Sequence, residues 1–210
     1  MKKFLLLLTL GATSLFPSGQ AQAAYGLFGT NGSFVILSLN GAANSYYHMT
    51  AGANAAFDGA ILGTFNSSIG NSLVLNGGEL QTFENGGDSV TSPASLFYRI
   101  YPTGSPSGSF NSISLNNLSF PGPPGDEKRD NTASNINMLS GLLNGDYTLE
   151  VFSSAAVDWN GQLGGGAEDT IFASNSGNNY KATFTVVPEP SRAVLALFGL
   201  VGLVTRRRRA

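Results

Sequence analysis

Residues 143–152 read Leu-Asn-Gly-Asp-Tyr-Thr-Leu-Glu-Val-Phe, and this stretch decides the fold class. Tyr147, Leu149 and Val151 occupy every second position, the period expected of a β-strand with one buried face. Asn144-Gly145, which comes just before, is a turn signal. The place of Tyr147 after this turn matches a tyrosine corner, in which the hydroxyl bonds to backbone a few residues upstream. We therefore expect a strand edge here, with a structural role for Tyr147.

The same alternation recurs outward from this stretch, and no helical period persists over three turns between residues 24 and 187. In 95–101, Leu96, Tyr98 and Ile100 share one face, and 181–186 alternates in the same way. Asn-Gly favours tight turns between antiparallel strands, and it occurs six times, at Asn31, Asn40, Asn76, Asn85, Asn144 and Asn160. We predict one all-β domain over 24–187, an antiparallel, Greek-key-like β-sandwich of roughly eight to ten strands.

Two local expectations follow from the turn signals. Asn76-Gly77 is expected to separate a strand over 72–75 from another over 79–83. Residues 121–130, rich in proline, glycine and charge, are expected to form an exposed loop.

Several segments of the predicted domain resemble a module of secreted bacterial surface proteins: 59–65, 75–80, 96–101, 145–151 and 178–184. That module is similar to an immunoglobulin-like sandwich appended to larger chains. The resemblance implies a sandwich fold and an extracellular setting, and it implies no particular activity.

Composition excludes several kinds of site. The chain has 210 residues, one histidine and no cysteine, which excludes disulfides, zinc-thiolate and iron–sulfur centres and thiol catalysis. The net charge of −2 hides an uneven distribution, because residues 24–187 hold four basic and twelve acidic side chains, a charge of −8. That charge repels phosphate, so we expect no nucleic-acid partner.

Residues 1–23 have the three parts of a secretory signal peptide. Lys2 and Lys3 form the basic start, 4–10 is an apolar run, and Ala21 and Ala23 give the small-x-small pattern that signal peptidase cleaves. The apolar run is too short to span about 30 Å of hydrocarbon. We predict cleavage after Ala23, the alternative being a buried first helix.

Residues 188–210 form a second segment unlike the middle of the chain. After Pro188-Glu189-Pro190 comes an apolar stretch over 193–204, and four basic residues follow at Arg206, Arg207, Arg208 and Arg209. Twelve residues make about 18 Å of helix, so flanking arginines would help it insert. The four arginines predict a cytoplasmic anchor with the rest of the chain outside, so the precursor inserts transiently in the inner membrane.

Pro188, Glu189 and Pro190, the short apolar helix and the arginine-rich end occur in this order at the C-terminal end, and together they resemble the PEP-CTERM sorting signal. Proteins with this signal are substrates of exosortase, a membrane-embedded transpeptidase-like enzyme of Gram-negative bacteria. The resemblance implies sorting to the cell surface or release, in lineages that make exopolysaccharide and biofilm matrix. An ordinary tail anchor with an incidental Pro-Glu-Pro is the alternative.

Catalytic patterns are weak in the middle of the chain. His48 lies in a predicted strand and is read as an edge-strand residue, because no Gly-x-Ser-x-Gly nucleophile elbow accompanies it. Nearly all of the carboxylates adjoin glycine, asparagine or serine, as solvated turn residues do. A secreted hydrolase would need two of them to converge in a cleft. We expect no enzyme and no cofactor.

Calcium is the metal that the loops would suit, because its ligands are oxygens. Asp126, Glu127 and Asp130 form one acidic group, and Glu168-Asp169 form another. Neither group has EF-hand spacing, and solvated charge is the alternative reading.

Trp159, between Asp158 and Asn160, is the candidate for stacking on a sugar, and burial in the core is its alternative role. We expect an exported, non-enzymatic surface or matrix protein that acts in adhesion or in association with extracellular polysaccharide. A carbohydrate-binding module that uses Trp159, with Tyr46 and Tyr47 as further platforms, is the second hypothesis.

Overall fold

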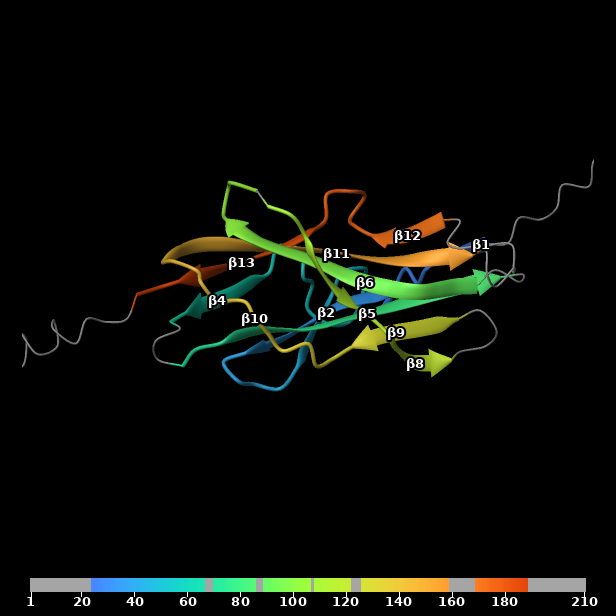
Figure 1. Ribbon diagram of the computed structural model, residues 1–210, viewed down its shortest axis with the longest axis horizontal. Coiled ribbons are helices and arrows are strands. Elements are labelled where there is room, and N and C mark those ends of the chain that lie inside the picture. Colours follow the sequence, from blue (N-terminus) through green and yellow to red (C-terminus); the bar gives the residue numbers. More distant parts are fainter. Residues whose placement is uncertain are drawn as a thin grey trace, which may run out of the picture.

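A computed structural model of the chain describes residues 24–66, 70–85, 89–106, 108–121, 126–158 and 169–188. Within these ranges the chain forms β-strands and no helix, which confirms the all-β prediction. None of these residues belongs to a helix that is long and apolar enough to cross a membrane. The strands form two sheets, which Figure 1 shows as two layers. The predicted signal peptide and the predicted helix over 193–204 lie outside the described residues.

The first sheet is built around the long strand β5 (Leu73–Asn85). Its path runs β3-β2-β5-β9-β8, and two further strands also pair with β5. The other members are β1 (Ala24–Leu27), β2 (Ser33–Leu39), β3 (Ser45–His48), β8 (Asn117–Pro121), β9 (Glu127–Asn131) and β10 (Ile136–Asn137).

The second sheet is built around β11 (Gly145–Asp158), whose first half is the stretch that predicted the fold. Its path runs β4-β13-β11-β6-β7, and β12 pairs with the second half of β11. The other members are β4 (Ile61–Phe65), β6 (Ser89–Pro102), β7 (Asn111–Ser114), β12 (Asp169–Ala173) and β13 (Tyr180–Val186).

The tyrosine corner before β11 is confirmed. The Tyr147 hydroxyl donates to the Leu143 carbonyl over 2.9 Å. Its ring stacks on Phe184 of β13 at 5.7 Å between centroids. Tyr147 therefore ties the chain entering β11 to the neighbouring strand, which is the structural role that the sequence predicted.

Asn76-Gly77 does not separate two strands, so that prediction is wrong. Ile36 pairs with Gly77 and Leu37 with Leu75, which leaves Asn76 as one extra residue in a β-bulge of β5. The bulge shifts the alternation by one position, so Leu75 before it and Leu80 after it are both buried. Gly77 has a φ of 133°, a backbone angle that residues other than glycine rarely adopt.

Asn40-Gly41 does form the predicted kind of turn. Both residues have positive φ, 52° and 73°, and the Ala42 amide donates to the Leu39 carbonyl over 3.0 Å. This is the type I′ geometry. Asn31-Gly32, by contrast, joins β1 to β2 along the same edge of β5, so an Asn-Gly pair alone does not fix a hairpin.

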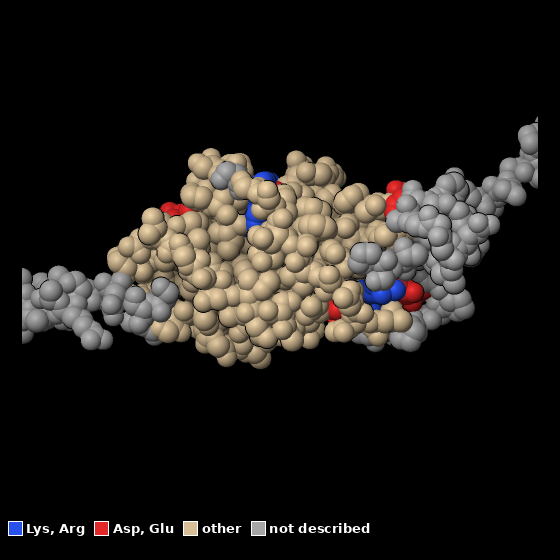
Figure 2. Space-filling model, in the orientation of Figure 1, with Lys and Arg blue, Asp and Glu red and all other residues tan. Residues whose placement is uncertain are grey.

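The prediction of an exposed loop over 121–130 is wrong for residues 127–130. Residues 122–125 lie outside the described residues, but Glu127–Asn131 form β9, paired with β5 and β8. On β9, Lys128 pairs with Glu79 at 3.2 Å and Arg129 with Glu127 at 2.8 Å. Figure 2 shows how sparse such charged side chains are on this face of the molecule.

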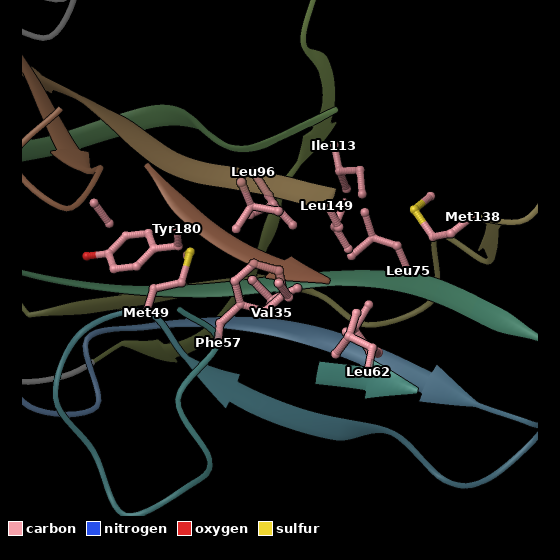
Figure 3. Close-up of a cluster of buried hydrophobic side chains, with 14 of the residues drawn as sticks. Val35, Met49, Phe57, Leu62, Leu75, Leu96, Ile113, Met138, Leu149 and Tyr180 are labelled. Atoms are coloured by element: carbon pink, nitrogen blue, oxygen red, sulfur yellow. The ribbon is translucent and has the colours of Figure 1, made fainter. Parts of the chain in front are cut away.

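The hydrophobic core lies between the two sheets. Figure 3 shows Val35 and Leu75 from the first sheet near Leu96 and Leu149 from the second, and all four are 0% exposed. Phe57, from the connection between β3 and β4, is also fully buried and fills the same core. Burial of these side chains is the main stabilising term.

The two ends of the described chain lie far apart. β1 pairs with the last residues of β5, whereas β13 ends beside the first residues of β11, which lie next to the last residues of β6 on their other side. β1 and the C-terminal end of β13 are therefore at opposite ends of the long axis (Figure 1).

Substitution of Gly77 by alanine tests the bulge. A methyl group there would overlap the Asn131 carbonyl oxygen, whereas Gly41, which also has positive φ, has open space around it. We expect Gly77→Ala to lower the free energy of unfolding by more than about 3 kcal/mol and Gly41→Ala by about 1 kcal/mol, measured by urea denaturation. Equal losses would contradict the close approach of β9 to the bulge.

Candidate functional site

Most of the predicted site residues cannot be placed. Ala21 and Ala23 of the cleavage site, Trp159, Glu189, Pro190 and the arginines at 206–209 lie outside the described residues. Pro188 is described and lies two residues after the end of β13. The site that the structure does define is on the outer face of the second sheet.

Strand register brings aromatic and charged side chains together on that outer face. Leu96, Leu149 and Val151 point into the core, so their neighbours along β6 and β11 point outward. Phe97 lies opposite Phe152, and two residue pairs further along, on the same face, Arg99 lies opposite Glu150. These cross-strand pairs are the centre of what we call the outer-face cluster, completed by Tyr101, Phe110, Phe172 and Asn179.

Glu150 is the most deeply buried charged group of the cluster. Its side chain is 3% exposed, and its Oε2 accepts from Arg99 Nε at 3.1 Å and from Nη2 at 2.9 Å. Asn179 Nδ2 donates to Oε1 over 2.7 Å. Arg99 Nη1 also donates to the Gly108 carbonyl over 3.2 Å. The ion pair thus joins β6 and β11 to the connections after β6 and before β13.

Burial and the contacts of the ion pair together shift the pKa values of Glu150 and Tyr101. Burial acts to raise the pKa of Glu150, but hydrogen bonds from Asn179, Tyr101 and Arg99 and the charge of Arg99 outweigh it, so the pKa lies below its ordinary value. Burial, together with the hydrogen bond to Glu150 and its charge, raises the pKa of Tyr101 to about 12. Glu150 is therefore held ionised, the opposite of what a general acid needs.

Aromatic rings surround the ion pair. Phe97 and Phe152 stack with centroids 4.6 Å apart, and Phe110 meets Phe152 edge-on at 5.0 Å. The Arg99 guanidinium carbon lies 4.4 Å from the Phe110 centroid, a cation–π contact. The ring centroids of Phe172 and Phe152 are 6.5 Å apart, and Phe172 is 56% exposed. Phe172 therefore offers an apolar surface to solvent beside hydrogen-bonding groups.

The first sheet holds the other residues that sequence analysis considered. Tyr46 packs edge-on against Phe34, and Tyr47 against the buried Phe57. His48 lies at the end of the edge strand β3, as predicted. Its Nδ1 has no hydrogen-bond partner among the described residues, so the orienting carboxylate of a catalytic triad is not seen there.

The acidic residues considered as calcium ligands do not come together in the described part of the chain, and two of them bond to other side chains. In the ranges that the structure describes, no group of three or more Asp, Glu or His side chains could hold a metal ion. Glu127 pairs with Arg129. Asp169 accepts a hydrogen bond from Tyr25 of β1, which links the two sheets, and Glu168 is outside the described part.

The comparisons with known proteins add no relative. No protein-family model matches the chain, and neither a curated protein nor a solved structure gives a match.

Sequence reasoning did not assemble the outer-face cluster, although part of the signal was present. The alternation over 95–101 already placed Phe97, Arg99 and Tyr101 on one face. Which strand pairs with β6, and in what register, depends on long-range contacts that no local pattern gives. Phe110 and Asn179 come from connecting segments without any period.

Glu150→Gln tests the ion pair. Because the folded pKa lies below the ordinary value of 4.5, the stabilisation from Glu150 is present well above pH 4.5 and is lost as the pH falls through the folded pKa. We expect Glu150→Gln to lower the free energy of unfolding at pH 7 by about 2 kcal/mol and to flatten its decline below pH 4.5.

Glu79→Gln, which breaks the more exposed pair with Lys128, is the control at pH 7 and should cost less than about 1 kcal/mol. Urea denaturation at a series of pH values measures both variants. If the free energy of unfolding of Glu150→Gln declined below pH 4.5 as steeply as that of the wild type, the stabilising role of ionised Glu150 would be contradicted.

Proposed function

We propose that the chain is an exported, non-enzymatic surface or extracellular-matrix protein, sorted by exosortase, that acts in adhesion or in association with exopolysaccharide. The observation that carries this proposal is the three-part C-terminal segment, Pro188-Glu189-Pro190, an apolar stretch and four arginines. The basic and apolar segment over 1–23, with its signal-peptidase site, supports export. The precursor inserts transiently in the inner membrane, and the processed form is at the cell surface or outside.

We infer further that the exported part is a Greek-key-like β-sandwich. Two stacked sheets with a shared core support this. So do the chain's passages between the sheets, from β3 to β4, from β4 to β5, from β5 to β6, from β7 to β8 and from β10 to β11. Such a domain presents a rigid surface for binding, while its acidic charge opposes nucleic acids.

Alanine substitution of Pro188, Glu189 and Pro190 together tests the sorting proposal. In a host with an active exosortase, we expect the processed form to fall at least about tenfold and the membrane-retained precursor to accumulate, because the enzyme has lost its recognition motif. Immunoblots of membrane and extracellular fractions measure this. The matched control is Pro123→Ala with Pro124→Ala, which removes prolines elsewhere. Unchanged processing in the triple variant would contradict the proposal.

Carbohydrate binding is the second candidate function, and the exposed ring of Phe172 favours it. Aromatic faces pack against the C–H face of a sugar ring, while amides and charged groups bond to hydroxyls. In the outer-face cluster, Phe172 and Phe152 lie on the same sheet face as Arg99 and Asn179. Trp159 stays a predicted stacking residue outside the described part.

Phe172→Ala tests this second function. We expect the variant to bind the host's extracellular polysaccharide about tenfold more weakly than the wild type, because the exposed ring is lost. A tenfold change in affinity corresponds to about 1.4 kcal/mol of binding free energy. Leu118→Ala is the control, since Leu118 is also exposed (47%) but lies on β8 of the first sheet. Trp159→Ala measured in parallel shows whether the tryptophan contributes. Equal binding by wild type and Phe172→Ala, in sedimentation with insoluble polysaccharide, would exclude this face.

A further inference from the structure

The end of the domain from which the chain leaves after β13 carries a highly exposed leucine. The last residue pair between β11 and β13 is Gly145 with Val186. Leu143 and Pro188 each lie two residues beyond this pair, on the same side of it, so they are at the same end of the molecule. Figure 1 shows the stretch that leads into β11 next to the end of β13. Leu143 is 80% exposed there.

The main chain around Leu143 is held in place by its neighbours. Leu139 is 5% exposed, and Leu142 packs against the same hydrophobic core. The Leu142 amide donates to the Leu139 carbonyl over 3.3 Å, and the Tyr147 hydroxyl donates to the Leu143 carbonyl. These contacts use the adjacent leucines for the core and leave the Leu143 side chain directed to solvent.

Three connections that the structure describes at this end hold no charged side chain. They are the turn from β2 to β3 (40–44), the chain that follows β6 (103–106) and the chain from β10 to β11 (138–144). Asp146 lies just inside β11, where its carboxylate accepts from the Thr185 hydroxyl over 2.6 Å. Anionic lipids repel acidic groups, so an end with uncharged turns can approach a membrane more closely than the rest of this acidic domain.

The proposed function brings this end of the domain to a membrane. The apolar stretch over 193–204 begins five residues after Pro188, and five residues span at most about 18 Å in any conformation. In the membrane-inserted precursor, Pro188 is therefore within that distance of the apolar stretch. A single exposed leucine is ordinary on a protein surface. The position of Leu143 at the membrane-proximal end is what gives it a partner.

We propose that this end of the domain docks on the lipid surface in the membrane-inserted precursor, with the Leu143 side chain in the interface between headgroups and acyl chains. The inference rests on the proposed function, because the stretch over 193–204 brings the domain to the membrane. Transfer of a leucine side chain from water into this interface is favourable, and the uncharged turns beside it lose no charge hydration. The long axis then points away from the membrane, which leaves the outer-face cluster accessible.

The test places one fluorophore beside Leu143. The chain has no cysteine, so Asn144→Cys can carry a single environment-sensitive label. The precursor, exported by a host without exosortase, is reconstituted into vesicles of phosphatidylethanolamine and phosphatidylglycerol, with a nitroxide quencher on the upper acyl chains of some lipids. We expect quenching of this label to fall about threefold when Leu143→Ser is added. Ile61→Ser is the matched control and should change nothing, because Ile61 is 84% exposed but begins β4, away from this end.

Equal quenching with and without Leu143→Ser would overturn the proposal, and so would an equal loss in Leu143→Ser and Ile61→Ser. A blue shift of the emission without quenching would mean that a second copy of the chain covers the leucine, which also overturns it. A separate label at Leu197→Cys tests the proposed function. If that label is not quenched, the apolar stretch is not in the bilayer and the proposed function fails, while the Leu143→Ser comparison still decides whether this end binds lipid.

Discussion

The structure depends on the pairing of β11 along both of its edges. One edge is hydrogen-bonded to β6 over most of its length, and the other is shared by β13 and then β12. A strand bonded in this way has its side-chain alternation fixed, since a slip of one residue would turn the whole buried set outward. Leu149 and Val151 are therefore held in the core while Glu150 and Phe152 must face out.

That constraint places a buried charge on the outer face of the sheet. Glu150 is nearly inaccessible although it points away from the core, because the connection carrying Phe110 and the turn carrying Asn179 fold over it. A buried carboxylate is tolerated only when it is paired and hydrogen-bonded. Arg99 and Asn179 meet that requirement, so the two connecting segments are tied to the sheet that they cover.

The sequence predicted the all-β class, the tyrosine corner and the turn at Asn40-Gly41, because each depends on neighbouring residues. It did not predict the bulge at Asn76. An Asn-Gly pair fits the turn of a hairpin, and it also fits a β-bulge within one continuous strand. Only the pairing of β5 with β2 shows that Asn76-Gly77 belongs to a bulge. The outer-face cluster has the same origin, since Arg99 and Glu150 meet through a register between distant strands. The hydrogen bond from the Asn66 side chain to the Pro188 carbonyl joins residues 122 positions apart, a separation that no local pattern spans.

The position of the two ends of the described domain has a mechanical consequence. β1 and the C-terminal end of β13 lie at opposite ends of the long axis (Figure 1), so tension applied between these two ends acts parallel to the strands. β13 is bonded through seven residue pairs to β11 and four to β4. Such tension shears these ladders as a set instead of unzipping them rung by rung. The β4 ladder is the shorter of the two, so it contributes fewer residue pairs to resisting this shear than the β11 ladder does.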